Sequence, residues 1–533
     1  MNRRMFLKGL AAAGMSAFAP SLTSLRGLYP AAHAMVDYQG VSVIAPSVMP
    51  QVINIFLYGG PSELSGNLTN IVEINDNSQN SYTGRFGNEI LQNDVDGTGN
   101  NGLITRNGFW RGAGGTHMQY MLDQGMMSVY RTIHKVKNPT RSHRESVLMG
   151  LKGSLDVDFG AGVGTRIAAM MLENRSAYET GSTALADGTI ISDITDVTSL
   201  PLPYVSLEGE TRAFQQDPDI NLPLALRYLT LSEDFDNPYA RNNNGDGPAL
   251  ELIADTVRDQ AYLDRYRGVA DAFSNRETME DNIGSLTGGA NPVSRTTDSS
   301  GNFLPSLSNT DTIVTDNPDF FEDQMDGTSR LRYPDRNQNR YADRIRAAVT
   351  LALENPSTMY ISVGGGLGGW DDHNNGVDRY PDRMEDLFET LRVAMLHIQL
   401  SAGTTPGGRT RTTDNIIINM FGDFGRRVNL NNSQGWDHGN NQNLWTFGGA
   451  GIRGAGALGK VVGKTARVGE SGTNNQVTEP TSDSYQAEPM SIASSVYSYF
   501  GVQNPELLTA DAEFNPDGDP PLDETVPGEM ALF

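Results

Sequence analysis

Three short polar clusters in the second half of the chain carry the side chains best suited to chemistry. They are Trp370-Asp371-Asp372-His373, residues 422–427, and Trp436-Asp437-His438-Gly439. We expect each cluster to lie where a β-strand ends. Histidines and aspartates in loops at several strand ends are the ligand set that holds zinc, manganese or similar ions. Two such ions could clamp a phosphate or sulfate ester. The alternative is that these side chains only cap turns.

The segments around these clusters predict how they are positioned. Residues 359–363 form an apolar run before the first cluster, and residues 416–421 lie directly before the second. Between them, apolar residues in 379–400 recur at intervals of three and four residues, which is the spacing of an amphipathic helix. A strand–helix–strand order with polar strand ends is how open α/β sheets place a site at their carboxyl edge.

An earlier segment offers a second set of chemical groups. A predicted strand, 127–133, leads into Arg141-Ser142-His143 and then into a predicted helix, 146–151. Ser142 and Glu145 have the spacing of a capping box, which would give both a purely structural role. Alternatively, a serine at a helix N-terminus beside a histidine and arginines faces an electropositive spot suited to an anion. The sequence leaves both interpretations open.

Composition and charge exclude several classes of protein. The 533 residues carry a formal net charge of −24, which argues against nucleic acid or an anionic membrane surface as the main partner. The chain has no cysteine, which excludes disulfides, thiolate metal sites and iron–sulfur clusters. Gly364-x-Gly366-x-x-Gly369 matches a dinucleotide fingerprint in form, but no helix pattern follows it. We therefore expect no nucleotide cofactor.

The N-terminus has the pattern of an export signal. Arg3-Arg4-Met5-Phe6-Leu7-Lys8 is a twin-arginine motif, an apolar stretch 9–20 follows, and Ala32-His33-Ala34 offers a cleavage site. The apolar stretch is too short to span a bilayer, so we expect a signal peptide, 1–34, and no stable membrane anchor. The expected partner during export is the twin-arginine translocase, and the expected location is periplasmic or extracellular. The alternatives are a basic amphipathic helix or a membrane anchor.

The rest of the chain reads as one large α/β domain, 35–503, followed by an acidic tail, 504–533. Segments near 66–112 and 284–330 are rich in Asn, Asp, Ser and Gly, and we expect them to be loop-like insertions. Periodicity predicts further strands at 51–58, 204–207 and 444–447, and helices at 160–173, 250–281, 337–354 and 490–500.

Taken together, the motifs resemble those of domain-of-unknown-function family 1501, whose members are exported by the twin-arginine route. The resemblance is carried, in the order of the family, by Gly59-Gly60-Pro61-Ser62, Arg141-Ser142-His143, Gly368-Gly369-Trp370-Asp371-x-His373, Phe421-Gly422-Asp423-Phe424-Gly425-Arg426 and Asp437-His438-Gly439. That family is similar to the alkaline phosphatase and sulfatase superfamily. The resemblance implies a central, mostly parallel sheet with helices on both faces and a metal site at the strand ends.

The resemblance also implies roles for individual residues. It makes Asp371, His373, Asp423 and His438 candidate metal ligands and places Ser142 where the nucleophile belongs. Where many family members carry Asp after the first strand, this chain has Ser62 followed by Glu63, and we take both as further candidate ligands. Where the family usually carries Glu, the chain has Asp423.

These observations predict an exported metal-dependent hydrolase acting on a small anionic phosphate or sulfate ester. Ser142 with His143 would form its catalytic centre, and Arg141 or Arg426 would steady the anion. The cofactor would be a divalent ion such as zinc, manganese, magnesium or calcium. The alternative function is a non-catalytic exported binding or envelope-associated protein with a degenerate metal site.

Overall fold

The computed structural model describes residues 38–68, 105–155, 157, 160–216, 220–233, 307–334, 340–364, 369–403, 411–469 and 476–509. The expected signal peptide, most of the insertion near 66–112 and the expected helix at 250–281 lie outside these residues. The expected acidic tail begins with a short helix, α16 (Glu506–Thr509), and the rest of it also lies outside them.

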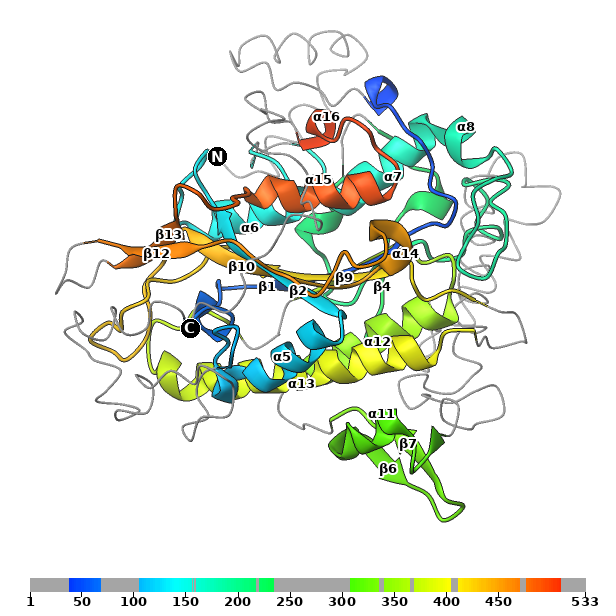
Figure 1. Ribbon diagram of the computed structural model, residues 1–533. Helices are drawn as coiled ribbons and strands as arrows, with labels where there is room; N and C mark the ends of the chain where they lie inside the picture. The colour runs from blue at the N-terminus through cyan, green and yellow to red at the C-terminus, as the bar shows by residue number, and fades with distance from the viewer. Residues whose placement is uncertain are drawn as a thin grey trace, which may run out of the picture. The chain divides into compact units, whose positions relative to one another are not determined.

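An eight-stranded, mostly parallel sheet forms the centre of the fold, with the strand order β11-β2-β10-β9-β1-β8-β3-β4 (Figure 1). β1 (Gln51–Leu57) lies between β8 (Tyr360–Val363) and β9 (Ile416–Gly422) and runs parallel to both. All three strands are buried along their whole length, as expected for continuous apolar runs covered on both faces. The expected α/β architecture is confirmed at this level.

The remaining strands complete the sheet on either side. β3 (Tyr204–Ser206) and β4 (Leu229–Thr230) continue it in parallel beyond β8. On the other side, β10 (Asn441–Gly448) runs antiparallel to both β9 and β2 (Met127–His134). β11 (Val461–Val462) pairs in parallel with β2 at the edge. Because β10 is reversed, it begins at the sheet edge where β1, β2, β8 and β9 end.

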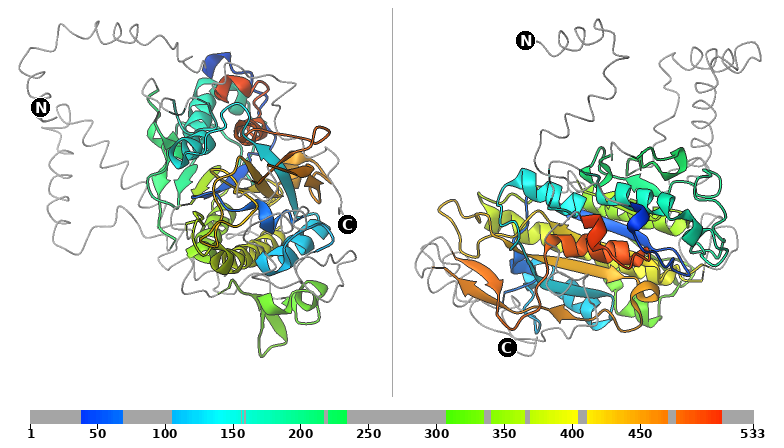
Figure 2. Two further views of the ribbon diagram at one scale, coloured as in Figure 1. Left: turned by 90° about the vertical axis from the view of Figure 1, so that its left-hand side faces the viewer. Right: turned by 90° about the horizontal axis from the view of Figure 1, so that it is seen from above.

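Helices cover both faces of the sheet (Figure 1). One face carries α5 (Gly115–Asp123), α12 (Arg340–Glu354) and α13 (Gly376–Leu400). The apolar stripe of α13 is buried in the main core, as its periodicity predicts, although the helix begins at residue 376, earlier than expected. The other face carries α6 (His143–Lys152), α7 (Val163–Glu173) and α15 (Pro489–Tyr499), which Figure 2 shows from above.

Residues 307–330 of the expected insertion at 284–330 contain short strands and helices, and residues 284–306 lie outside the described part of the chain. β5 (Leu307–Ser308), β6 (Phe321–Asp323) and β7 (Thr328–Leu331) form a small antiparallel sheet with α11 (Thr312–Thr315) beside it. The hairpin between β6 and β7 turns at Asp326-Gly327, where Gly327 has a φ of 81°. A polar composition concealed this hairpin because only alternate residues of β7 are buried.

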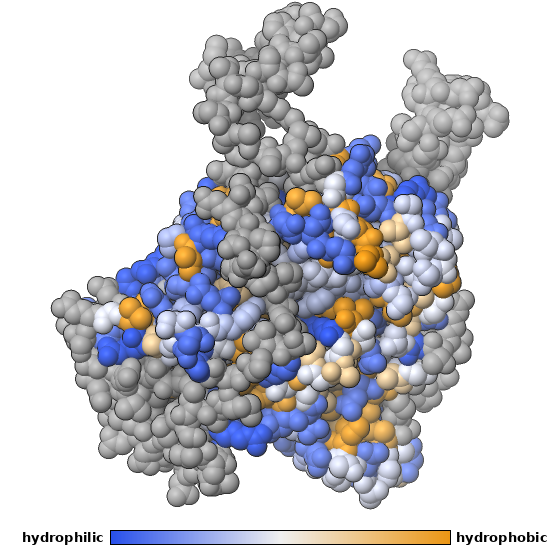
Figure 3. Space-filling model, turned by 45° about the horizontal axis from the view of Figure 1, so that its top comes forward, coloured by the Kyte–Doolittle hydropathy of each residue, from blue (hydrophilic) through white to orange (hydrophobic). Residues whose placement is uncertain are grey.

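Shorter elements connect these layers. They are the helices α8 (Arg175–Tyr178) and α14 (Ala450–Arg453), the hairpin strands β12 (Thr465–Val468) and β13 (Val477–Pro480), and the 3₁₀ turns η3 (Tyr38–Gly40), η4 (Glu63–Ser65), η6 (Arg111–Ala113), η7 (Arg212–Phe214), η8 (Leu224–Leu226) and η10 (Pro318–Phe320). Within the described ranges, no helix is both long enough and apolar enough to cross a membrane. On the face shown in Figure 3, hydrophobic residues lie in small groups between hydrophilic ones.

Candidate metal centre

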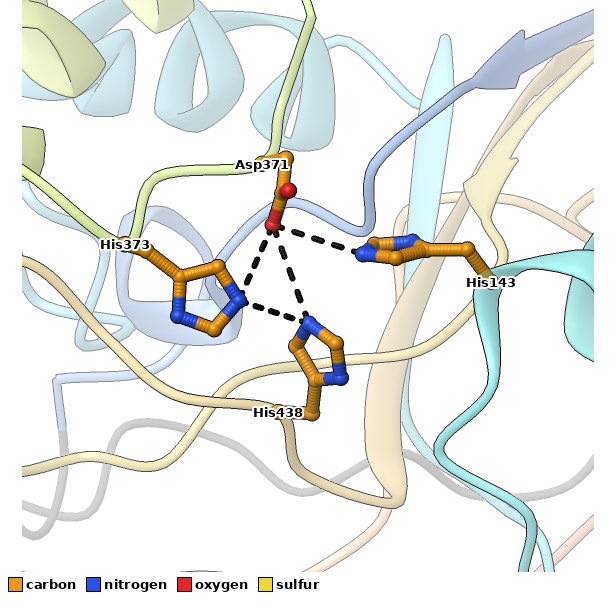
Figure 4. Close-up of side chains that lie close together, drawn as sticks. All are labelled: His143, Asp371, His373 and His438. Carbon is orange, nitrogen blue, oxygen red and sulfur yellow. Dashed lines mark hydrogen bonds and ion pairs between the residues drawn. The ribbon is translucent and has the colours of Figure 1, made fainter.

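Four side chains meet at the carboxyl edge of the sheet: His143, Asp371, His373 and His438 (Figure 4). His143 is the first residue of α6, which follows β2. Asp371 and His373 lie between β8 and α13, and His438 lies just before β10. The third polar cluster therefore precedes a strand, contrary to expectation. It still reaches the same edge because β10 is antiparallel to its neighbours.

The four side chains point toward one centre. One ligand atom from each lies within 4.8 Å of the others. Asp371 Oδ1 is 3.4 Å from His143 Nε2, 3.2 Å from His373 Nε2 and 3.7 Å from His438 Nε2. The Nε2 atoms of His373 and His438 are 2.8 Å apart. Figure 4 shows these four contacts as dashed lines.

The other ring nitrogen of each histidine has a hydrogen-bond acceptor of its own. His143 Nδ1 lies 2.7 Å from Asp423 Oδ2, and His373 Nδ1 lies 3.2 Å from Asp437 Oδ1. His438 Nδ1 lies 2.8 Å from the backbone oxygen of Arg141. Carbonyl and carboxylate oxygens only accept, so each Nδ1 carries a hydrogen, and in the tautomer that carries its only hydrogen there the ring offers Nε2 to a metal ion.

Three ring nitrogens and a carboxylate oxygen thus converge. The Nε2 atoms of His373 and His438 lie within hydrogen-bond distance of each other, and among the described residues His143 Nε2 is buried without a hydrogen bond. A metal ion bound between these atoms would give each of them a partner. Imidazole and carboxylate together suit zinc, manganese or iron, whereas magnesium and calcium prefer sites built wholly from oxygen. The four residues could therefore hold a metal ion.

The protonation of the ligands follows from their surroundings. Burial, reinforced by the charge of Arg426, lowers the pKa of His438 to about 4 and keeps its ring neutral. Partial burial opposes ionisation of Asp371, but the hydrogen bond and charge of Arg426 outweigh it and lower the pKa of this carboxyl. The hydrogen bond to Asp423 raises the pKa of His143, so protons compete with a metal ion at this ring at low pH.

Asp423 supports a ligand and does not join the convergent group. It is 2% exposed, and its Oδ2 accepts the hydrogen bond of His143 Nδ1. A carboxylate behind a histidine fixes the orientation of the ring and raises its basicity. Asp437 does the same for His373. The role of Asp437 escaped sequence reasoning because its partner lies 64 residues away.

Ser62 and Glu63 lie outside the convergent group. Ser62 is the N-cap of η4, and its hydroxyl accepts a hydrogen bond from Leu64 N at 3.4 Å. Glu63 is buried between Thr478 Oγ1, at 2.6 Å, and the backbone N–H of Arg426, at 3.3 Å. Complete burial raises the pKa of Glu63 to about 7, against the effect of these hydrogen bonds. The structure thus gives both residues supporting contacts in place of the expected ligand role.

Ser142 is the N-cap of α6 by position, but its side chain caps nothing. Of the two interpretations left open, the capping box is not formed, since Glu145 instead accepts a hydrogen bond from Thr140 Oγ1 at 2.6 Å. The Ser142 hydroxyl is exposed and has no hydrogen-bond partner in the described part of the chain. Arg141 is also exposed, and the one bond of its guanidinium within those residues is the 3.3 Å contact from Nε to Asn440 Oδ1.

Arg426 differs from Arg141, and its expected role as an anion-binding residue is corrected. Its side chain is fully buried, and its guanidinium bonds to backbone carbonyls and to Asp371. With its donors occupied in this way, Arg426 has no free edge to offer a substrate.

Fold and site together define an α/β protein with a candidate metal centre at the carboxyl edge of its sheet. Comparison of the chain with known protein-family models and with curated proteins finds no match. Its chemistry must therefore be argued from the geometry of the site.

Proposed function

We propose that this protein is an exported metal-dependent hydrolase that acts on a phosphate or sulfate ester. The observation that carries the proposal is the convergence of three histidine Nε2 atoms and Asp371 Oδ1, in which one of the histidines, His143, directly follows Ser142 in the chain. The mostly parallel sheet and the edge at which the site lies support an alkaline-phosphatase-like fold. The twin-arginine motif supports export to the periplasm or beyond.

The residues around the centre suggest which group would perform each step of ester hydrolysis. A bound metal ion would supply positive charge that stabilises a negatively charged transition state. The Ser142 hydroxyl, which has no hydrogen-bond partner among the described residues, would attack the phosphorus or sulfur, and its proton would pass through solvent to the departing oxygen, which leaves as the alcohol. Water would then cleave the serine ester and restore Ser142. Arg141 would pair with the oxygens of the anion, since its guanidinium makes no carboxylate contact among the described residues.

A second candidate function is a non-catalytic exported protein that binds one metal ion. The observation in its favour is that, across the described ranges, the only convergent group of this kind surrounds a single point. Clamping an ester between two ions would require a second set of ligands. Ser62 and Glu63, which were expected to help supply that set, contact other partners.

Ser142→Ala and Ser142→Asp test the proposal on metal-loaded protein. Both should abolish hydrolysis across a panel of phosphate and sulfate esters, because neither side chain can form the serine ester. Both should bind metal as the wild type does and melt within about 2 °C of it, since the hydroxyl caps nothing. A wild type that holds metal but hydrolyses no ester would instead support the binding protein. Retained turnover in Ser142→Asp would remove Ser142 from the mechanism.

A further inference from the structure

Arg426 joins the turn after β1 to two of the loops that carry the residues of the metal centre. Its Nε donates to Gly60 O at 2.7 Å and its Nη1 to Trp436 O at 3.0 Å. Its Nη2 donates to Trp370 O at 3.2 Å and to Asp371 Oδ1 at 2.6 Å, and also to Gly59 O. These partners lie in the turn after β1, the loop after β8 and the loop before β10.

The loops pack closely around this guanidinium. Gly59 has a φ of 106°, and a Cβ added there would lie 2.4 Å from the backbone nitrogen of Asp371. Arg426 also forms an isolated β-bridge with His438. Backbone carbonyls buried in such a junction need donors, and a planar guanidinium supplies several in one fixed geometry. Arg426 therefore adds a buried set of side-chain contacts to the backbone hydrogen bonds that join these loops.

The charge of Arg426 makes its location informative. A guanidinium 2.6 Å from Asp371 Oδ1 stands beside the point where a cation would bind and should repel that cation. The same contact fixes the direction of the carboxylate toward the three histidines. Charge and positioning therefore predict opposite effects on metal affinity when Arg426 is replaced.

We infer that Arg426 is a positioning residue of the metal centre, which aims Asp371 Oδ1 at the three Nε2 atoms and holds the loops of Asp371, His373 and His438 in place. This inference rests on the metal site of the proposed function but requires no catalytic activity. On this view, the gain in ligand geometry outweighs the repulsion between the guanidinium and the metal ion.

Replacing Arg426 with Lys and with Met separates the two effects. Lys keeps the positive charge but lacks the planar set of guanidinium N–H donors, and Met removes both the charge and the donors. Each variant should bind Zn²⁺ and Co²⁺ roughly 10- to 100-fold more weakly than the wild type, as measured by chelator competition, because outer contacts typically contribute that much. The visible absorption of bound Co²⁺ should also change. Tighter metal binding by Arg426→Met would show that the charge of Arg426 outweighs its positioning effect, and the inference would be wrong. Affinities within about threefold of the wild type in both variants would show that Arg426 contributes only to stability, and the inference would again be wrong.

Arg131 provides the matched control. It is a buried arginine on β2 whose Nε donates to Gly66 O at 2.9 Å, and it also bonds to Asn107 O. Arg131→Lys and Arg131→Met should lower the melting temperature as the Arg426 variants do but leave metal affinity within about threefold. An equal loss of affinity in the control pair would show that general destabilisation explains the effect.

Hydrogen exchange on the wild type tests the inference even if no variant folds. Loops that Arg426 already holds should protect the backbone amides of Trp370, Asp372 and Trp436 before metal is added, with little further gain on adding Zn²⁺. Protection that arises only with Zn²⁺ would mean that the ion, and not Arg426, orders the loops. A wild type that binds neither ion would overturn both the metal centre and this inference. Normal binding with unaffected Arg426 variants would overturn the inference alone.

Discussion

The turn after β1 and the loop after β8 leave the sheet from neighbouring parallel strands, and each carries a carboxylate close to the sheet edge. Glu63 turns inward, is 1% exposed and meets a hydroxyl and a backbone N–H. The Asp371 side chain is about half exposed and meets the guanidinium of Arg426 and the three histidines. Similar positions in the sheet have therefore produced two different environments.

The difference between the two carboxylates lies in what compensates their burial. Among the described residues no cationic group pairs with the Glu63 carboxylate, so desolvation dominates and raises its pKa to about 7. Arg426 contacts Asp371 and more than offsets its partial burial, so the pKa of Asp371 is lowered. A carboxylate at a strand end becomes a candidate ligand only when its surroundings keep it ionised and aim it at other donors.

The largest effect that this comparison predicts is on Asp371. Asp371→Asn removes the only carboxylate of the convergent group and should weaken Zn²⁺ binding by more than the roughly 100-fold that loss of an outer contact costs. Isothermal titration calorimetry on the full chain would measure the loss. The neighbouring Asp372→Asn is the control, because Asp372 is buried and pairs with Arg383 at 2.5 Å outside the group. Equal losses in the two variants would contradict a specific role for Asp371.

The second prediction concerns the pH dependence of stability. Glu63 has a folded-state pKa raised from 4.5 to about 7, so the folded protein binds more protons than the unfolded chain between these values. Its contribution to stability is therefore favourable at low pH and is lost as pH rises through 7. Glu63→Gln stays neutral and should raise the free energy of unfolding at pH 8 by at most about 3 kcal/mol, with little change at pH 4.5.

Urea unfolding of the wild type and Glu63→Gln at both pH values would measure this difference. Glu322→Gln, at an exposed position on β6, is the matched control and should leave the pH profile unchanged. A Glu63→Gln variant that is less stable than the wild type at pH 8 would show that the ionised carboxylate is needed. Glu63 would then resemble Asp371 in needing its negative charge, and the proposed difference between the two carboxylates would be contradicted.

The parts of the fold that could be predicted from the sequence depend on local periodicity. The sequence predicts β1 and β9 because strands buried on both faces are continuous apolar runs. It predicts α13 because apolar residues recur along one face of the helix. The hairpin at 321–331 was missed because its strands are short and mostly polar. Local patterns carry no information about which strand lies beside which.

The same limit applies to the candidate site. Polar clusters at strand ends pointed to Asp371, His373 and His438, and the structure brings these residues together. His143 was predicted for the catalytic centre beside Ser142 and not for the convergent group, and its place in that group depends on β10 lying reversed between β2 and β9. For the same reason, nothing in the sequence marks Arg426 as a buried contact of Asp371.

The smallest expected effect, on Ser62, tests whether the turn after β1 belongs to the metal centre at all. Its hydroxyl accepts one long hydrogen bond, 3.4 Å from Leu64 N, at the start of a single 3₁₀ turn. Loss of an N-cap usually costs about 1 kcal/mol, so Ser62→Ala should cost no more than that and should leave Zn²⁺ affinity unchanged. Asp311→Ala is the control. It removes the 3.0 Å hydrogen bond that caps α11, so it measures the stability cost of losing an N-cap outside the metal centre. If Ser62→Ala weakens metal binding while Asp311→Ala does not, then Ser62 contributes to the centre, and the turn after β1 is a ligand loop as the family resemblance implies.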